Sequence, residues 1–223
     1  MNFDAGNIYL NYFRLDASAY RDKVRFYEEN PKAISSLYFD ERIEIDIDYL
    51  LCLFEVGRYE RFLSKVDIVL ESIIVENIFE FKNQNIFNEL LFRKAACLFQ
   101  LKKFLNAEEI LKQLIRMESK NPLYIGLYSI CKRKQPNDIS LTIKAIANAS
   151  FLLVLSITVA RIFLIEPFFD DWLKPFLILR GFLFIFGVMC LFGLELSFQN
   201  KIYKETGVFS HGLINTIFGK KVK

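Results

Sequence analysis

Two long apolar segments dominate the pattern of hydrophobic and polar positions along this chain. Residues 145–165 contain Arg161 as their only charge, and residues 175–194 contain Arg180 as theirs. About 20 apolar residues in a helix cover the roughly 30 Å apolar core of a bilayer. The rest of the chain has too little apolar surface to wrap two such helices in a water-soluble fold. Because only EPFFDDWLKP joins them, the segments predict an antiparallel transmembrane hairpin.

The charges around the hairpin predict its orientation. Basic residues precede the first segment and follow the second, whereas the connecting turn holds three acids and one lysine. The positive-inside rule therefore places both termini in the cytoplasm, as in a two-span integral protein of a bacterial inner membrane. The basic residues are Lys132, Arg133, Lys134 and Lys144 on one side and Lys201 and Lys204 on the other.

The two arginines lie at similar distances from the acidic turn, within the apolar segments. One interpretation is that Arg161 and Arg180 reach the interface, where Asp170 and Asp171 neutralise them. The other is that one arginine faces an acid of another membrane subunit or lines a pathway, because charges inside a membrane are often functional.

Small side chains form one side of the first apolar segment. Ala149, Ser156 and Ala160 follow one another at spacings of seven and four, which places them on one helix face. We expect this face to pack on the second segment, where Gly187 and Gly193 permit close approach. Contact with another subunit is the alternative.

Before residue 140 the pattern changes to apolar residues at spacings of three and four, which predicts helices. Only the short stretch RIEIDID is ambiguous. The sequence therefore predicts an all-α protein with a cytoplasmic helical domain over residues 1–140, the hairpin over 141–198 and a cytoplasmic tail over 199–223. An interfacial helix is expected in the tail, with an apolar side of Val208, Phe209, Leu213, Ile214, Ile217 and Phe218.

A self-similarity at a shift of 45 residues runs through the helical part. LLCLFEVGRYERFLSKVDIVL, residues 50–70, aligns with AACLFQLKKFLNAEEILKQLI, residues 95–115. Each unit reads as helix, tight turn and helix. The matched positions are Leu50 and Ala95, Leu53 and Leu98, Tyr59 and Phe104, Phe62 and Ala107, Val66 and Leu111, and Val69 and Leu114.

Residues 44–122 resemble the tetratricopeptide-repeat family. Its motif has a small and a large residue in the first helix, an aromatic after a short turn, small and large residues in the second helix, and often a closing proline. The second unit carries this motif on Ala95, Leu98, Phe104, Ala107, Leu111, Leu114 and Pro122. The first keeps Leu53, Gly57 and Tyr59 but has bulky Leu50 and Phe62 where small residues are usual. The 45-residue period exceeds the typical 34, which predicts longer helices or an insertion near ENIFEFKNQN.

The resemblance implies stacked helix pairs, whose first helices line an inner wall. This wall is aromatic with acidic edges, so a partner with an apolar segment and basic flanks is expected. The alternative is a closed bundle without a groove. The wall residues implied by the resemblance are Glu44, Ile47, Leu51, Phe54, Glu55, Glu89, Phe92, Ala96, Phe99 and Gln100.

Composition narrows the function classes. The positive charge belongs to the apolar part, and residues 1–139 hold 20 basic and 21 acidic residues, so no nucleic-acid partner is expected. The start MNFDAGNIYL lacks the features of a cleaved export signal. Four cysteines in apolar contexts are expected to be free thiols. No catalytic motif occurs, His211 is the only histidine, and Glu108 and Glu109 are expected on a solvated helix face, so no enzymatic activity, metal or cofactor is predicted.

Two functions remain. The first is a membrane-anchored adaptor or scaffold, whose helical repeats bind a protein partner and hold it at the lipid surface to assist assembly of a membrane complex. The second is a small integral subunit of a transporter, secretion machine or pore-forming effector, in which the hairpin is the working part.

Overall fold

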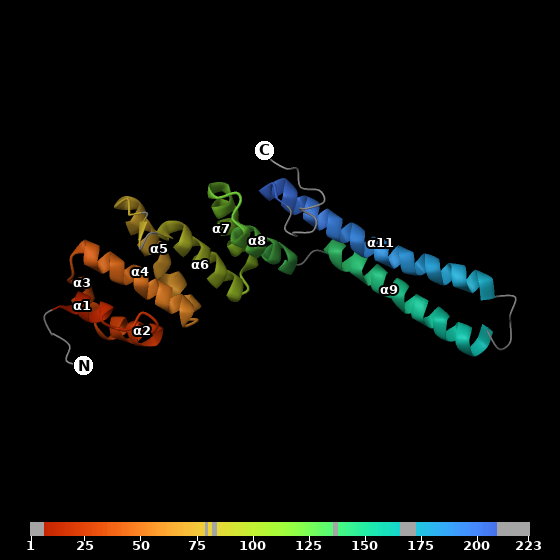
Figure 1. The fold of residues 1–223 in the computed structure, drawn as a ribbon, viewed down its shortest axis with the longest axis horizontal. Helices are drawn as coiled ribbons and strands as arrows, with labels where there is room; N and C mark the ends of the chain where they lie inside the picture. The colour runs from red at the N-terminus through yellow and green to blue at the C-terminus, as the bar shows by residue number, and fades with distance from the viewer. Residues whose placement is uncertain (1–6, 79, 82–83, 136–137, 166–172, 209–223) are drawn as a thin grey trace. The chain divides into compact units, whose positions relative to one another are not determined.

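The computed structural model describes residues 7–78, 80–81, 84–135, 138–165 and 173–208, and these are almost wholly helical (Figure 1). The predicted all-α class is confirmed, apart from one very short strand pair. The first elements are α1 (Ile8–Phe13), α2 (Tyr20–Glu29), α3 (Pro31–Ser35), α4 (Phe39–Glu55) and α5 (Tyr59–Val75). Next come β1 (Glu80–Phe81), β2 (Gln84–Asn85), α6 (Ile86–Gln100), α7 (Phe104–Met117) and α8 (Pro122–Lys134). The last are α9 (Asp138–Ala160), the π-helical turn η1 (Arg161–Ile165) and α11 (Leu173–Thr206).

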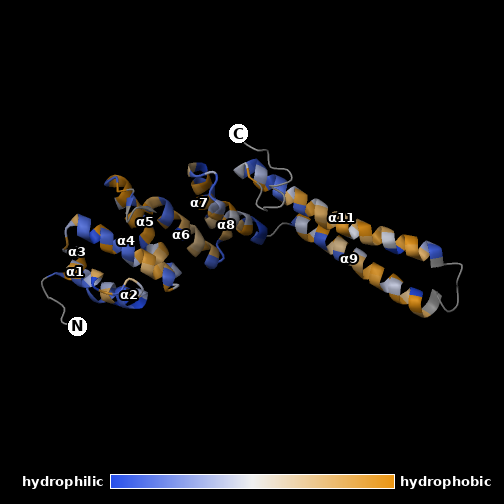
Figure 2. Cartoon of the chain, viewed as in Figure 1, coloured by the Kyte–Doolittle hydropathy of each residue, from blue (hydrophilic) through white to orange (hydrophobic). Residues whose placement is uncertain are grey.

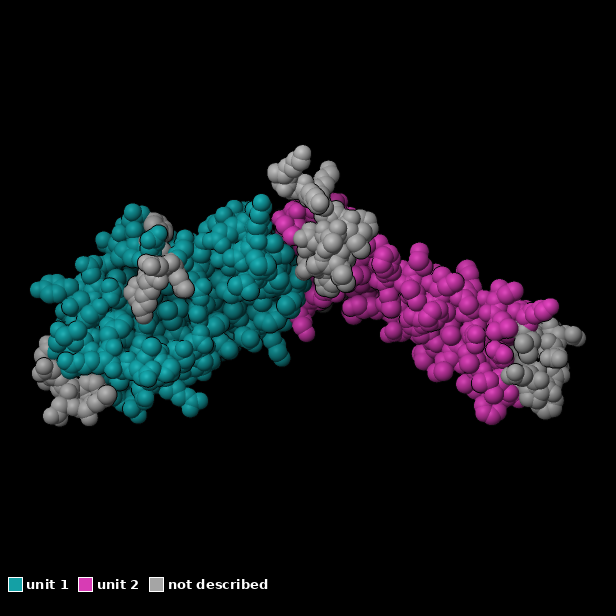
Figure 3. All heavy atoms as spheres, viewed as in Figure 1, with its two compact units in different colours: residues 1–132 teal, residues 133–223 magenta. Residues whose placement is uncertain are grey.

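The chain divides into two compact units, Met1–Lys132 and Arg133–Lys223, which Figure 3 colours separately. Local sequence sets several helix starts in the first unit. Asn7 and Asn85 cap α1 and α6 by accepting hydrogen bonds from the backbone N–H groups of Leu10 and Asn88. Proline begins α3 and α8, where its missing N–H costs no hydrogen bond.

Helix α4 is central to the first unit, because it packs against α1 and α2 on one side and against α5 and α6 on the other. This explains RIEIDID, whose alternating Ile43, Ile45 and Ile47 are all buried although the segment is helical. A helix covered on two sides buries residues two apart, which imitates the pattern of a strand. Three tyrosines of α1 and α2 donate to acids of α4: Tyr9 to Glu44 (2.5 Å), Tyr12 to Asp48 (3.2 Å) and Tyr27 to Asp46 (2.6 Å).

The 45-residue duplication is visible in the backbone. Gly57 and Lys102, which are 45 residues apart, both have a positive φ, at 80° and 61°. The turn closes the same way in each unit, with hydrogen bonds from Arg58 N to Leu53 O and from Lys103 N to Leu98 O, both 2.9 Å. All the matched core positions except Tyr59 and Phe104 are buried, and those two are half-buried. The α4–α5 and α6–α7 pairs are therefore two copies of one helical hairpin.

The length of the period also has a structural cause. Helices α4 to α7 have 14 to 17 residues each, and β1 pairs with β2 antiparallel between α5 and α6. This strand pair lies within ENIFEFKNQN, where an insertion was predicted.

In the second unit, α9 and α11 pack antiparallel and are apolar along most of their length (Figure 2). Residues Asp138–Phe163 and Lys174–Thr206 are long and apolar enough to cross a membrane, and only 11% and 6% of their most apolar stretches are buried. A core helix of a water-soluble protein would be mostly buried. The two helices are consistent with two membrane spans.

The structure revises the predicted start of the C-terminal tail, and it does not describe the acidic connecting segment. Helix α11 continues to Thr206, so residues 199–206 extend the second apolar helix rather than belonging to a separate tail. Asp170 and Asp171, and the tail positions after Val208, lie outside the described residues.

Candidate functional site

The aromatic residues predicted for the inner wall occupy equivalent positions in the two hairpins. Phe54 lies 6.1 Å from Tyr59 between ring centroids, and Phe99 lies 5.5 Å from Phe104. In each helical hairpin the last turn of the first helix thus contacts the first residue of the second helix. Phe54 and Phe99 remain half-buried, so each ring keeps an accessible part.

Arg93 joins the two helical hairpins of the first unit and was not predicted as a site residue. Its guanidinium donates to Glu55 at 2.7 Å and to Glu89 at 2.6 Å, and its Cζ lies 4.6 Å from the centre of the Phe54 ring. Burial opposes protonation of Arg93, but the hydrogen bonds that it donates to the two carboxylates outweigh this effect and raise its pKa. One guanidinium therefore offsets part of the charge of these two carboxylates. The i, i+4 spacing to Glu89 is visible in the sequence, whereas the contact with Glu55 depends on the packing of α6 beside α4.

The other end of the predicted wall is covered. Glu44 accepts the Tyr9 hydroxyl, Ile47 is fully buried, and the Phe92 ring packs 5.3 Å from Tyr124 of α8. The closed-bundle alternative thus describes this part of the array. Toward the ends of α4 and α6 the predicted wall residues are half-buried or exposed, and we name them the α4–α6 surface: Leu51, Phe54, Glu55, Ala96, Phe99 and Gln100.

The expectation that Glu108 lies on a solvated face is wrong. Glu108 is buried and accepts from Lys112 at 2.7 Å and from Lys132 at 3.0 Å, which ties α7 to the end of α8. A second buried ion pair joins Lys23 to Asp48 at 2.8 Å, and Tyr12 donates to the same carboxylate oxygen. Both clusters are internally satisfied, as buried charges must be.

The described cysteines are free thiols, and Cys52 donates to the buried carboxylate of Asp48 at 3.8 Å. Burial raises the pKa of Cys52 and Cys97 to about 12 and that of Cys131 to about 11. These thiols are protonated at neutral pH and are poor nucleophiles. Within the described ranges no group of three or more His, Cys, Asp or Glu side chains is placed to hold a metal ion.

The face of α9 that contacts α11 is not the predicted small-residue face. Ala149 and Ser156 are exposed and Ala160 is half-buried, whereas Ala147 and Ser150 are buried. The small residue on the other side of the contact is Gly187, where an added Cβ would lie 2.4 Å from Ser150 Oγ. An added Cβ at Gly193 would meet nothing within 4 Å. The predicted face is available for lipid or for another subunit.

The contact between Ser150 and Gly187 also sets where Arg161 and Arg180 lie relative to each other along the hairpin. Ser150 lies beside Gly187, and the Phe151 ring lies 5.9 Å from the Phe184 ring, which fixes the antiparallel register. In this register Arg161 is level with about residue 175 of α11. Arg180 is then roughly 7 Å further from the connecting segment, at about 1.5 Å per residue. The two arginines therefore lie at different depths.

A charged cluster marks the other end of the hairpin. Arg133 donates to both carboxylate oxygens of Glu195, at 3.0 and 2.8 Å, and its Cζ lies 4.4 Å from the centre of the Phe198 ring. Gln199 is buried and donates to Glu195 at 2.9 Å. A fork-shaped pair of this kind fixes geometry as well as charge. Glu195 is thus neutralised within the second unit.

Comparison with protein-family models, with curated proteins and with solved structures finds no match for this chain. The tetratricopeptide-repeat resemblance therefore stays a prediction from the sequence.

Proposed function

We propose that this protein is a membrane-anchored adaptor that binds a protein partner on the α4–α6 surface and holds it at the bilayer. The observation that carries the proposal is that a duplicated helical array with its own core shares a chain with two apolar helices whose surface the chain itself leaves unburied. Such helices are stable only when lipid or other membrane helices cover them. A partner bound to the array would then be concentrated at the membrane.

The orientation belongs to the same proposal. The lysines and arginines that flank the hairpin favour an array in the cytoplasm, with residues 166–172 on the far side. The polar cluster of Arg133, Glu195 and Gln199 fits the cytoplasmic headgroup region, where an ion pair retains access to water.

The chemistry of the α4–α6 surface favours a largely apolar partner segment. Phe54 and Phe99 offer aromatic area, whereas Arg93 already offsets part of the charge of Glu55 and Glu89. The sequence predicts a partner with basic flanks. Their attraction to this surface is weaker than the number of its acidic residues implies, because Arg93 already offsets part of that charge. A helix with apolar side chains on one face is the partner class that fits.

Photo-crosslinking in intact membranes tests the proposal. A photoreactive amino acid at Gln100, which is exposed on the α4–α6 surface, is expected to capture one protein identified by mass spectrometry. The matched control is the same probe at Tyr38, which is 85% exposed and lies outside this surface. If the two sites yield the same adducts, or Gln100 yields only lipid, the adaptor function is excluded.

The second function, a hairpin that works within a membrane machine, rests on the placement of Arg161 and Arg180 at two depths in apolar helices. Under it, replacing both arginines with leucine abolishes assembly or activity while capture from Gln100 persists. Under the adaptor function, capture is lost when Phe54 and Phe99 are replaced with alanine, and it survives the arginine replacements.

A further inference from the structure

A cavity of about 400 Å³ lies between α2 and α5, away from the α4–α6 surface. Tyr27, Tyr49 and Pro31 form apolar parts of its wall. Its polar groups come from Glu28 of α2 and from Arg61, Ser64 and Lys65 of α5. Tyr27 and Tyr49 stack with centroids 3.8 Å apart and planes 11° apart, so the aromatic wall is rigid. Its size and mixed lining are those of a site for a small molecule.

Lys65 has no direct ion pair among the described residues, and the nearest acid in its hydrogen-bond chain is Asp46, which accepts from the Tyr27 hydroxyl. Its Nζ donates to the Tyr27 hydroxyl at 3.0 Å and lies 4.5 and 5.4 Å from the centres of the Tyr27 and Tyr49 rings. It makes no ion pair with any carboxylate of the described residues. A half-buried ammonium held by aromatic rings and one hydroxyl retains donors for an anion.

Two arginines add to this charge. Arg58 and Arg61 both donate through one terminal nitrogen to the same carboxylate, Glu28, and both side chains are about half exposed. One negative charge therefore faces two positive charges, and a net positive charge remains. Their remaining N–H groups are open to a further acceptor, because a guanidinium carries five donors.

The start of α5 points to the same ligand class. No side chain caps this 17-residue helix, so N–H groups of its first turn are free of capping side chains. A second hollow of about 440 Å³ adjoins this turn and shares Arg61 with the first cavity. Helix N-termini attract anions through these N–H groups and the helix dipole.

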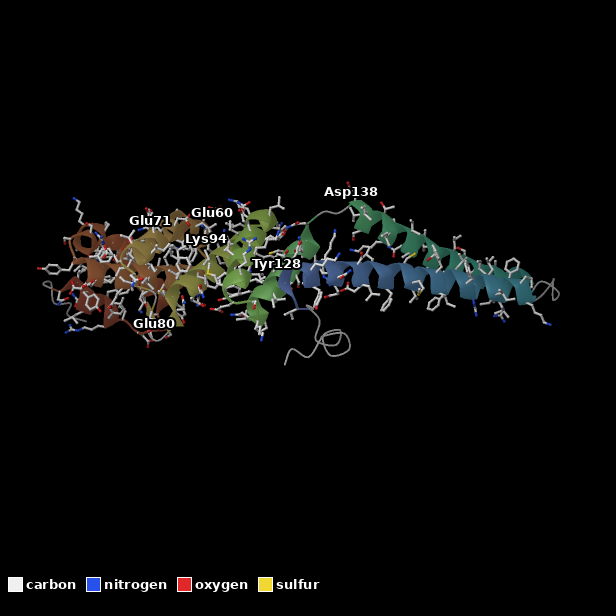
Figure 4. All side chains as sticks on the ribbon, turned by 90° about the horizontal axis from the view of Figure 1, so that it is seen from above. Glu60, Glu71, Glu80, Lys94, Tyr128 and Asp138 are labelled. Atoms are coloured by element: carbon white, nitrogen blue, oxygen red, sulfur yellow. The ribbon has the colours of Figure 1, made fainter. Side chains whose placement is uncertain are left out.

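The internal repeat shows that the fold does not require these charges. The positions 45 residues after Arg61 and Lys65 are Asn106 and Ile110, and α7 folds and packs as α5 does. Glu60, which is also in the first turn of α5, and Glu71 are exposed (Figure 4). Arg61 and Lys65 are therefore specific to the first helical hairpin, whereas Arg58 has a basic counterpart in Lys103.

We propose that this cavity binds the phosphate monoester group of a small molecule, with Arg61 and Lys65 as its main ligands and the half-buried Tyr27 against the attached organic group. A phosphate monoester carries a charge of about −1.5 to −2 at neutral pH. A ligand carboxylate would bring one negative charge, as Glu28 already does. A phosphate monoester brings nearly two, and Lys65 can offset the second. The site is independent of the α4–α6 surface and of its partner.

Phosphorus NMR on the full-length protein in neutral detergent tests this, with phenyl phosphate as the probe. Broadening of the phosphate signal on titration reports binding, and sodium chloride holds the ionic strength constant. Lys65→Met and Arg61→Gln are each expected to weaken binding at least about tenfold, because each removes a charge-assisted hydrogen bond. Arg116→Gln, an exposed cation on α7 outside the cavity, is expected to bind as the unchanged protein does.

Vesicles with and without phosphatidic acid distinguish a lipid headgroup from a soluble phosphate. Binding of phosphatidic acid that is lost in Lys65→Met, without binding of phenyl phosphate, assigns the same site to a lipid. Absence of binding to either probe at about 10 mM phosphate overturns the proposal, as does equal affinity for sulfate. Unchanged affinity in both variants, with circular dichroism spectra like that of the unchanged protein, also overturns it.

Discussion

Replacing Gly187 with alanine should loosen the hairpin of α9 and α11, because the new methyl group has no room. Its Cβ would lie 2.4 Å from Ser150 Oγ and 3.0 Å from two carbons of the Phe151 ring. Either α9 and α11 separate, or Ser150 rotates and loses its 2.7 Å hydrogen bond to the Ala147 carbonyl. Separation by about 0.5–1 Å forfeits a quarter to a half of the dispersion energy at the contact.

The expected cost is about 1–3 kcal/mol in the free energy of separating the helices, the usual range for overpacking. The matched control is Gly193→Ala on the same helix, where an added Cβ meets nothing within 4 Å. There the better helix propensity of alanine, worth up to about 1 kcal/mol, makes the change neutral or stabilising. Ser150→Ala should restore roughly 1 kcal/mol in the double variant by removing the oxygen that clashes.

Unfolding in mixed detergent micelles measures these differences. Fluorophores on cysteines introduced at the exposed positions Leu141 and Ser197, in a background free of native cysteines, report the separation of α9 and α11 by energy transfer. We expect Gly187→Ala to unfold at a lower fraction of dodecyl sulfate than Gly193→Ala. Equal midpoints for these two variants would refute the Ser150–Gly187 contact and the register derived from it.

Three further predictions concern charge and thiol chemistry. Burial opposes ionisation of Glu28, but hydrogen bonds from Arg61 and Arg58 outweigh it and lower its pKa. Its contribution to stability is therefore present at neutral pH and declines as the pH falls below about 4.5. Glu28→Gln should lower the unfolding midpoint at pH 7, and this effect should shrink as the pH is lowered. Arg133→Glu should destabilise the hairpin, and adding Glu195→Arg should restore most of the loss in the same micelle assay. A double variant no more stable than Arg133→Glu alone would contradict a stabilising ion pair. Mass spectrometry after maleimide treatment should find the buried thiols unmodified in the native protein and modified after unfolding; they are Cys52, Cys97 and Cys131.

The sequence by itself determined the two apolar helices and the duplicated helical hairpin. Both follow from patterns local to a segment, such as an uninterrupted apolar run or the spacing of Leu53, Gly57 and Tyr59 and its copy 45 residues later. Helix formation and turn closure depend on neighbours a few residues apart, so these features could be predicted without a tertiary structure.

Only the tertiary structure decided which faces meet. Helix α9 is apolar all round, so no periodicity marks the side that faces α11, and the predicted face of Ala149 and Ser156 is exposed while Ser150 is buried. The bridge from Arg93 to Glu55 and the placing of Lys65 over Tyr27 join helices 38 residues apart in the chain. Such contacts depend on the rotation of each helix about its own axis and on how closely two helices approach, and neither quantity is encoded in a local pattern.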